Sequence, residues 1–116
     1  MKITRKESHI EDKHGIKLWV YPVGRKEAGV VYVEVEEGHF QEFFDKKSTF
    51  IYYIIEGQGT FFLDGKETTV KEADLVVIPP MTKIYYFGKM RMTLTTVPAW
   101  EPENEVHVRF IEKPSN

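Results

Sequence analysis

Short apolar runs with a period of two, separated by turn residues, limit how this chain can fold more than any other feature. The clearest run is VVYVEVE at residues 30–36, where Val31, Val33 and Val35 should face a core and the residues between them should face outward. Such runs recur about every 8–12 residues and no helical periodicity is present, which is typical of a β-sandwich or β-barrel. We therefore predict an all-β fold with strands at 17–23, 30–36, 49–56, 59–63, 67–70, 74–80, 83–87, 90–97 and 106–111.

Glycine and proline mark the boundaries between these runs. Asp64-Gly65 supplies the positive φ angles of a tight hairpin turn. Gly57 and Gly59 bracket what we expect to be another sharp turn. Pro79-Pro80 should end a buried strand, because proline cannot donate to a β-ladder.

The chain has the length of one domain. With 116 residues it can bury one continuous core but not two. We expect a single domain over 1–116, with a barrel core at about 17–98, an N-terminal arm at 1–16 and a C-terminal strand and tail at 99–116. The first fifteen residues and the final EKPSN have the weakest pattern, so we expect them to fray or to dock on a partner chain.

Composition excludes several classes of function. Sixteen basic and eighteen acidic residues are mixed along the chain, which argues against a nucleic-acid footprint. No apolar run is long enough for a signal peptide core or a membrane span, so we expect a soluble, cytoplasmic protein. The absence of cysteine excludes disulfides, thiolate metal sites, iron-sulfur clusters and a cysteine nucleophile.

Two spaced motifs resemble those of the small single-domain cupins, whose fold is a jelly-roll β-barrel. The first is GHFQEFFDKKSTFIYYIIEG, where Gly38 and Gly57 have the separation of the family's first motif. The second is EADLVVIPPMTKIYYFG, anchored by Pro79. The resemblance covers about residues 29–98 and implies the fold, but this fold hosts many unrelated activities.

The family's metal-ligand positions carry the wrong side chains for a metal. They fall on Phe44, Lys46, Phe50 and Ile84, where hydrocarbon offers no lone pair and a protonated lysine repels a cation. If the strand is regular, His39 points to the face opposite Phe44 and Lys46. We therefore predict no metal and no other cofactor, and leave open only a relocated site at His39 or at another of the scattered histidines, His9, His14 and His107.

The same positions predict a largely apolar cavity. Alternation from Phe44, Phe50 and Ile84 adds Tyr52, Ile54 and Tyr86, with Glu42 and Lys46 as paired polar groups. We expect ligand contacts from Glu42, Phe44, Lys46, Phe50, Tyr52, Ile84 and Tyr86, the two tyrosines being the favoured ones. Two alternatives stay open: the side chains fill the barrel completely, or Lys46 lies in solvent within the polar DKKS stretch.

Three functions fit this sequence. The first is a metal-independent cupin that binds a small organic molecule, with a sugar or sugar derivative as candidate. The second is a metal-free isomerase, epimerase or lyase using Lys46, Glu42 or Tyr86, and His39 only if a bulge turns it inward. The third is a structural or interaction module. The resemblance also implies a homodimer with exchanged N-terminal strands. We expect Trp100 to close one end of the core or to lie at a dimer contact, with ligand binding as the alternative.

Overall fold

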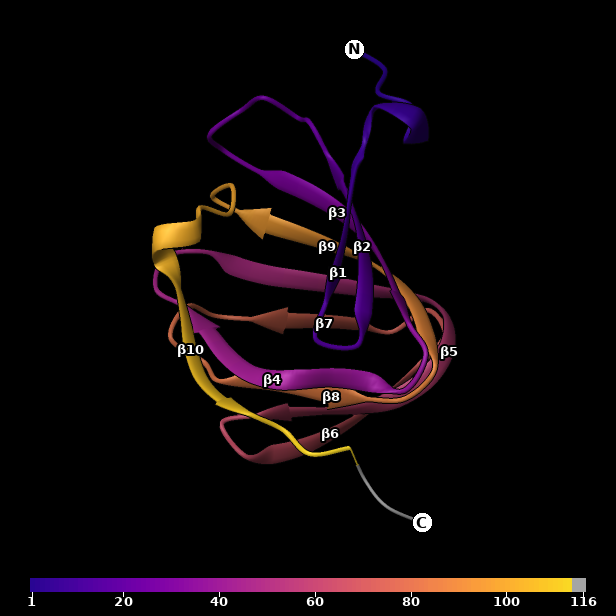
Figure 1. Cartoon of the computed structure of the whole chain (residues 1–116), viewed down its shortest axis with the longest axis vertical. Helices are drawn as coiled ribbons and strands as arrows, with labels where there is room; N and C mark the ends of the chain where they lie inside the picture. Colours follow the sequence, from indigo (N-terminus) through magenta and orange to yellow (C-terminus); the bar gives the residue numbers. More distant parts are fainter. Residues whose placement is uncertain (114–116) are drawn as a thin grey trace.

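Within residues 1–113, the part that the computed structural model describes, ten strands form one antiparallel sheet that curls on itself (Figure 1). The prediction of an all-β fold is confirmed, since the helical segments of this part are two 3-10 turns, η1 (Arg5–Glu7) and η2 (Pro102–Asn104). No helix in these residues is long and apolar enough to cross a membrane. Residues 114–116, the end of the predicted tail, lie outside the described part. The strands are β1 (His9–Lys13), β2 (Ile16–Tyr21), β3 (Gly29–Val35), β4 (Gly38–Asp45), β5 (Thr49–Leu63), β6 (Lys66–Lys71), β7 (Leu75–Ile78), β8 (Ile84–Phe87), β9 (Met90–Val97) and β10 (Glu105–Phe110).

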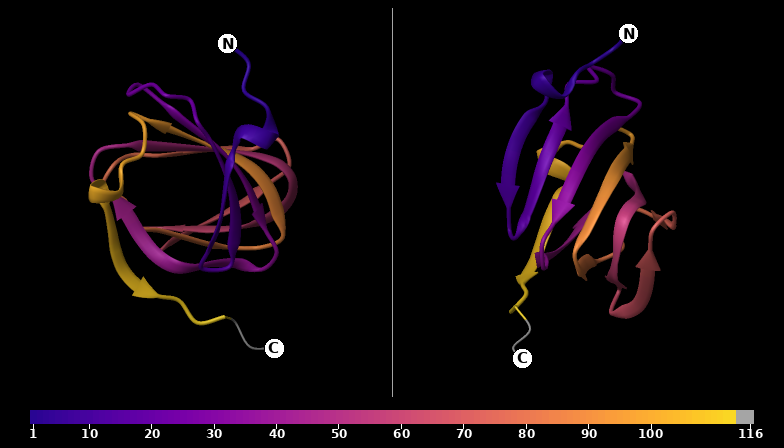
Figure 2. Two further views of the ribbon diagram at one scale, coloured as in Figure 1. Left: turned by 45° about the horizontal axis from the view of Figure 1, so that its top comes forward. Right: turned by 90° about the vertical axis from the view of Figure 1, so that its right-hand side faces the viewer.

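The sheet has two halves that share one long strand. Its order is β1-β2-β3-β9-β5-β8-β4-β10, and β6 and β7 also pair with β5. The first part of β5 pairs with β9 and β7, and its second part pairs with β8 and β6. We call β1, β2, β3, β9 and β7 half A, and β8, β4, β10 and β6 half B. The halves face each other around the interior, as the end-on view in Figure 2 shows.

The bend of β5 depends on a glycine. The β5–β9 register shifts between Ile54 and Glu56, and Gly57 follows with a φ of +93°. A Cβ atom at Gly57 would lie 2.1 Å from the backbone oxygen of Lys89, so the close approach of these two backbone segments excludes any side chain at this position. The sharp turn predicted between two strands is therefore wrong: the chain bends here within a single strand. The bend carries the strand from half A to half B.

The N-terminal arm is ordered on the outer face of half A rather than frayed. β1 pairs along its whole length with β2 of the same chain. The Arg5 guanidinium lies 4.4 Å from the ring centroid of Tyr32 and 5.1 Å from that of Trp19. This cover explains why Tyr32 is buried although alternation predicts that it faces solvent. Val33 and Val35 are in the core as predicted, whereas Val31 is only half-buried.

Two tight turns position the strands that flank the site. The predicted Asp64-Gly65 hairpin is confirmed, with φ angles of +52° and +79° between β5 and β6. His14-Gly15 forms the equivalent turn between β1 and β2. β1 was not among the predicted strands, and β4 was assumed only when the faces of His39, Phe44 and Lys46 were assigned. β1 and β10 are the two ends of the strand order, so side chains rather than a β-ladder join them across the seam.

Candidate functional site

A cavity of about 300 Å³ lies between the two halves of the sheet. Its walls are mostly apolar, which is typical of sites for small organic molecules. The deep residues come from β4, β5, β8 and β9, while the mouth is lined by the β1–β2 hairpin, the loop before β3, and the segment around Trp100. The deep residues that matter below are His39, Phe43, Phe50, Tyr52, Tyr86 and Leu94.

His39 is the titratable group at the bottom of the cavity. It is 2% exposed, its ring stacks on Tyr86 at 5.4 Å between centroids, and it meets Phe43 edge-on at 5.1 Å. Burial and, as the second cause, the nearby charge of Lys13 lower the pKa of His39 to about 3, while the Gln41 backbone acts in the opposite direction. The imidazole is therefore neutral at physiological pH and can accept a proton.

Tyr52 and Tyr86 place two phenols beside this imidazole. They are 2% and 1% exposed, and their ring centroids lie 5.9 Å apart in an edge-to-face arrangement. Burial raises the pKa of Tyr52 far above its ordinary value, with a hydrogen bond to Tyr86 acting in the opposite direction. Burial also raises the pKa of Tyr86. Both hydroxyls keep their protons at neutral pH, so the site combines a neutral base with two proton donors.

An ion pair closes the seam at the cavity mouth. Lys13 Nζ on β1 lies 2.7 Å from Glu105 Oε2 on β10. Trp100 Nε1 donates to Glu105 Oε1 at 3.2 Å, and Lys13 Nζ lies 5.6 Å from the Trp100 ring. Trp100 thus lies at the mouth, half in solvent, where a ligand can reach its ring.

The cavity contains three of the seven predicted ligand contacts. Phe50, Tyr52 and Tyr86 line it, and Trp100, weighed above only as an alternative contact, lines its mouth. Ile84 is buried in the surrounding core without lining the cavity.

The other three predicted contacts lie elsewhere. Phe44 is half-buried and Lys46 is exposed, and neither lines the cavity. The expected pairing of Glu42 with Lys46 is replaced by an ion pair from Arg109 Nε to Glu42 Oε1 at 2.9 Å. Arg109 also lies 5.7 Å from the ring centroid of Tyr85 on the outer side of half B. Glu42 and Phe44 lie on the outer face of β4, because the other face of this strand, which carries His39 and Phe43, turns toward the cavity.

The pairing of β4 with β8 shows which face of β4 turns inward. His39 pairs with Tyr86 and Phe43 with Ile84, so four residues of β4 span two residues of β8. His39 does lie opposite Phe44 and Lys46, as alternation predicts, but its own face is the inward one. Because the predicted cavity was derived from the family's ligand positions, His39 and Phe43 were not among its predicted contacts. No local pattern pointed to Lys13 and Glu105, which meet only across the seam.

No metal site emerges from the donor groups. Among residues 1–113, no cluster of three or more His, Cys, Asp or Glu side chains could hold a metal ion. The family's four ligand positions carry Phe44, Lys46, Phe50 and Ile84, none of which offers a neutral lone pair. The one buried imidazole of the cavity is surrounded by aromatic rings rather than by further ligands.

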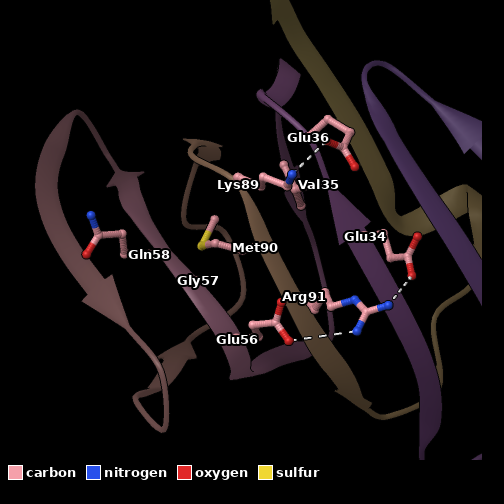
Figure 3. Close-up of a pocket in the computed structure, with 9 residues that line it drawn as sticks. All are labelled: Glu34, Val35, Glu36, Glu56, Gly57, Gln58, Lys89, Met90 and Arg91. Atoms are coloured by element: carbon pink, nitrogen blue, oxygen red, sulfur yellow. Dashed lines mark ion pairs between the residues drawn. The ribbon is translucent and has the colours of Figure 1, made fainter.

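A second, more open depression of about 730 Å³ lies away from this site (Figure 3). Its charged side chains pair with each other: Arg91 lies 3.6 Å from Glu34 and 3.8 Å from Glu56, and Lys89 lies 3.8 Å from Glu36. No buried titratable group lines it. The cavity around His39 is therefore the candidate site.

Solved structures resemble this chain closely. Pac13, described as a nucleoside dehydratase with a β-barrel structure, is 47% identical, with a TM-score of 0.96 over 97% of this chain and 94% of that one. Streptomyces PAC13 variants with uridine are 46% identical, and the one with a histidine-to-glutamine change has a TM-score of 0.95 over 97% of this chain and 93% of that one. KdgF from Halomonas sp., at 16% identity and a TM-score of 0.73 over 89% of this chain and 96% of that one, shares the fold alone. No curated protein sequence matches the chain.

The family follows from sequence as well as from shape. The family described as EutQ-like cupin domain matches residues 22–101, more than half of the chain. This match covers most of the curled sheet and every deep residue of the cavity. The chain belongs to the cupin family.

Proposed function

We propose that this protein is a metal-independent lyase that removes water from the sugar of a nucleoside. The observation that carries the proposal is the convergence of the buried His39, Tyr52 and Tyr86 in one cavity. The structures of Streptomyces PAC13 with uridine include variants of one histidine and two tyrosines. Those three positions are spaced 13 and 34 residues apart, and His39, Tyr52 and Tyr86 have the same two spacings.

Elimination of water needs a base and an acid on neighbouring atoms of the substrate. The base takes a proton from one carbon, the C–H electron pair becomes the C=C bond, and the C–O bond breaks with its pair on oxygen. The oxygen then takes a proton and leaves as water. In our proposal the neutral imidazole of His39 is the base, and a buried phenol, Tyr86 or Tyr52, supplies the proton to the leaving hydroxyl.

The substrate should carry a carbonyl beside the reacting carbon. A C–H bond ionises at neutral pH only when a neighbouring group can accept the electron pair, as a carbonyl does on forming an enolate. The developing negative charge would then be stabilised by the ammonium group of Lys13, which lines the cavity. We therefore expect sugar-oxidised nucleosides, rather than uridine itself, to react.

The apolar walls suit the other end of such a ligand. Phe43, Phe50 and Leu94 line the cavity, and Trp100 lies at its mouth. A planar nucleobase can stack on these rings while its polar edge remains near the wet mouth. A nucleoside is a sugar derivative, so this proposal is a narrower form of the ligand class expected from the sequence.

Binding and turnover test the proposal separately. Uridine binding is measured by calorimetry, and dehydration of oxidised nucleosides by mass spectrometry. Tyr86→Phe and His39→Gln should keep binding within a few-fold but lose about 10²–10⁴-fold in kcat. Tyr53→Phe is the matched control, because Tyr53 lies on the outer face of half A. Unchanged turnover in Tyr86→Phe and His39→Gln would refute the acid–base roles, and binding without any turnover would leave a binding protein.

We also propose that the protein is a homodimer formed through the outer face of β5 and β7. Leu75, Val77 and Tyr53 are 58%, 56% and 43% exposed, and cross-strand pairing places Tyr53 beside Leu75. No charged residue interrupts these positions, so a second copy could pack the same face without burying a charge. Size-exclusion chromatography with light scattering should give a dimer that Leu75→Glu converts to a monomer. Phe110→Glu, an exposed apolar position on β10, is the control. A monomeric parent protein would disprove this arrangement.

A further inference from the structure

A buried base must exchange its proton with water between turnovers. His39 is 2% exposed, and a ligand that fills the cavity excludes water from the side of the ring that faces the cavity. This need for proton exchange rests on the proposed function, in which His39 gains a proton from the substrate. While the cavity is occupied, any route from His39 to solvent has to pass through the residues packed around it.

His14 lies beside His39 and is exposed to solvent. The two ring centroids are 6.1 Å apart and the rings meet edge-on at 84°. The position of His14 is fixed by the backbone, since Phe40 N, next to His39, donates to His14 O at 2.7 Å. On its other side the His14 ring contacts the exposed Phe110 at 5.4 Å between centroids. With their centroids 6.1 Å apart, the two imidazoles are close enough for a proton to pass between them directly or through one water.

His39 has a nitrogen free for such an exchange. Its Nδ1 is buried and has no hydrogen-bond partner among the described residues. A buried polar atom without a partner is costly, so a water or a small movement of His14 that satisfies it is favoured.

The other neighbours of His39 do not offer this route. Phe43 has no exchangeable proton, and the phenols of Tyr86 and Tyr52 are buried, so neither of them reaches solvent. Lys13 is held in an ion pair with Glu105 at 2.7 Å. Among the described residues packed against His39, His14 is therefore the one that both carries an imidazole and reaches water.

We propose that His14 is the proton relay between His39 and bulk solvent. The proton that His39 takes from the substrate carbon passes to His14 and then to water, and His39 returns to its neutral form. The phenol that protonated the leaving hydroxyl regains a proton from water once the cavity empties, so no net proton is gained or lost. His14 touches no substrate in this scheme and acts only through His39.

The first experiment needs no turnover. NMR saturation transfer measures how fast the ring proton of His39 exchanges with water in the protein bound to uridine. His14→Asn is the main variant, because asparagine tolerates the φ of +50° at this turn, and His14→Gln is a second one. We expect exchange to slow by about ten-fold or more in both, as expected when a general acid–base group is lost. His107→Gln, which removes the other histidine that contacts Phe110, should change it less than two-fold.

A kinetic experiment supplies the second readout. In dilute buffer, His14→Asn should lower kcat, and added imidazole should restore it, because a small diffusing base can replace the relay. Rescue by imidazole is not expected of a residue with a purely structural role. Equal exchange rates in the parent protein and in both His14 variants would overturn the relay. If the parent protein dehydrates no nucleoside, the proposed function fails while the exchange experiment still decides on the relay.

Discussion

Acidification should destabilise the fold through His39. The imidazole is buried among aromatic rings and next to the charge of Lys13, so its protonated form is disfavoured in the folded protein. In the unfolded chain the same group has an ordinary pKa. The folded state therefore binds a proton less readily than the unfolded state, and falling pH shifts the equilibrium toward unfolding.

The magnitude follows from the two pKa values of His39, 6.5 in the unfolded chain and about 3 in the folded protein. Above pH 6.5 the group is neutral in both states and contributes no pH dependence. Below it, the free energy of unfolding falls by about 1.4 kcal/mol per pH unit, until the pH reaches the pKa of the folded state. Between pH 6.5 and pH 5 the loss due to His39 is about 2 kcal/mol.

Urea denaturation at pH 7.5 and pH 5.0 measures this loss for the parent protein and for His39→Gln. Other groups titrate in the same range, so the informative quantity is the difference between the two proteins in their change with pH. We expect the variant to be less sensitive to acid by about 2 kcal/mol, whatever its stability at pH 7.5. His107→Gln, at an exposed position, serves as the control. Equal acid sensitivity of the parent protein and His39→Gln would show that burial of His39 does not cause the loss of stability at low pH.

Three further predictions follow from particular contacts. Lys13→Met should raise the pKa of His39, because it removes a nearby positive charge, and an NMR titration of the His39 ring measures the shift. Gly57→Ala should destabilise the fold by about 2–4 kcal/mol, since it combines a strained φ with a clash against the Lys89 backbone. Gly24 also has a positive φ, but an added Cβ would meet no atom within 4 Å, so Gly24→Ala should lower the free energy of unfolding by only about 1 kcal/mol. Equal losses for Gly57→Ala and Gly24→Ala in urea denaturation would contradict a clash at Gly57. Elemental analysis of untagged protein should find no stoichiometric transition metal, and one bound equivalent would disprove this expectation.

Part of the candidate site could be predicted because it depends on position within regular strands. Phe50 comes from a ligand position of the family, and because β5 is regular there and Tyr86 lies on β8, alternation correctly added Tyr52 and Tyr86. Alternation along β4 carries no phase of its own, and the pairing of His39 with Tyr86 and of Phe43 with Ile84 sets which face turns inward. Predictions anchored on Phe44 therefore chose the outer face and passed over His39.

The all-β fold, the two cupin motifs and the lack of metal ligands at the family's positions can be recognised in the amino-acid sequence. These properties depend on residue types and on spacings within single segments, which the chain carries before it folds. The phase of β4, the bend of β5 over Gly57 and the contact of Lys13 with Glu105 arise from tertiary contacts. The reason is that alternation has a period of two but no fixed phase, and the register set by neighbouring strands chooses it. The seam likewise forms only when both ends of the curled sheet meet, which no local pattern encodes.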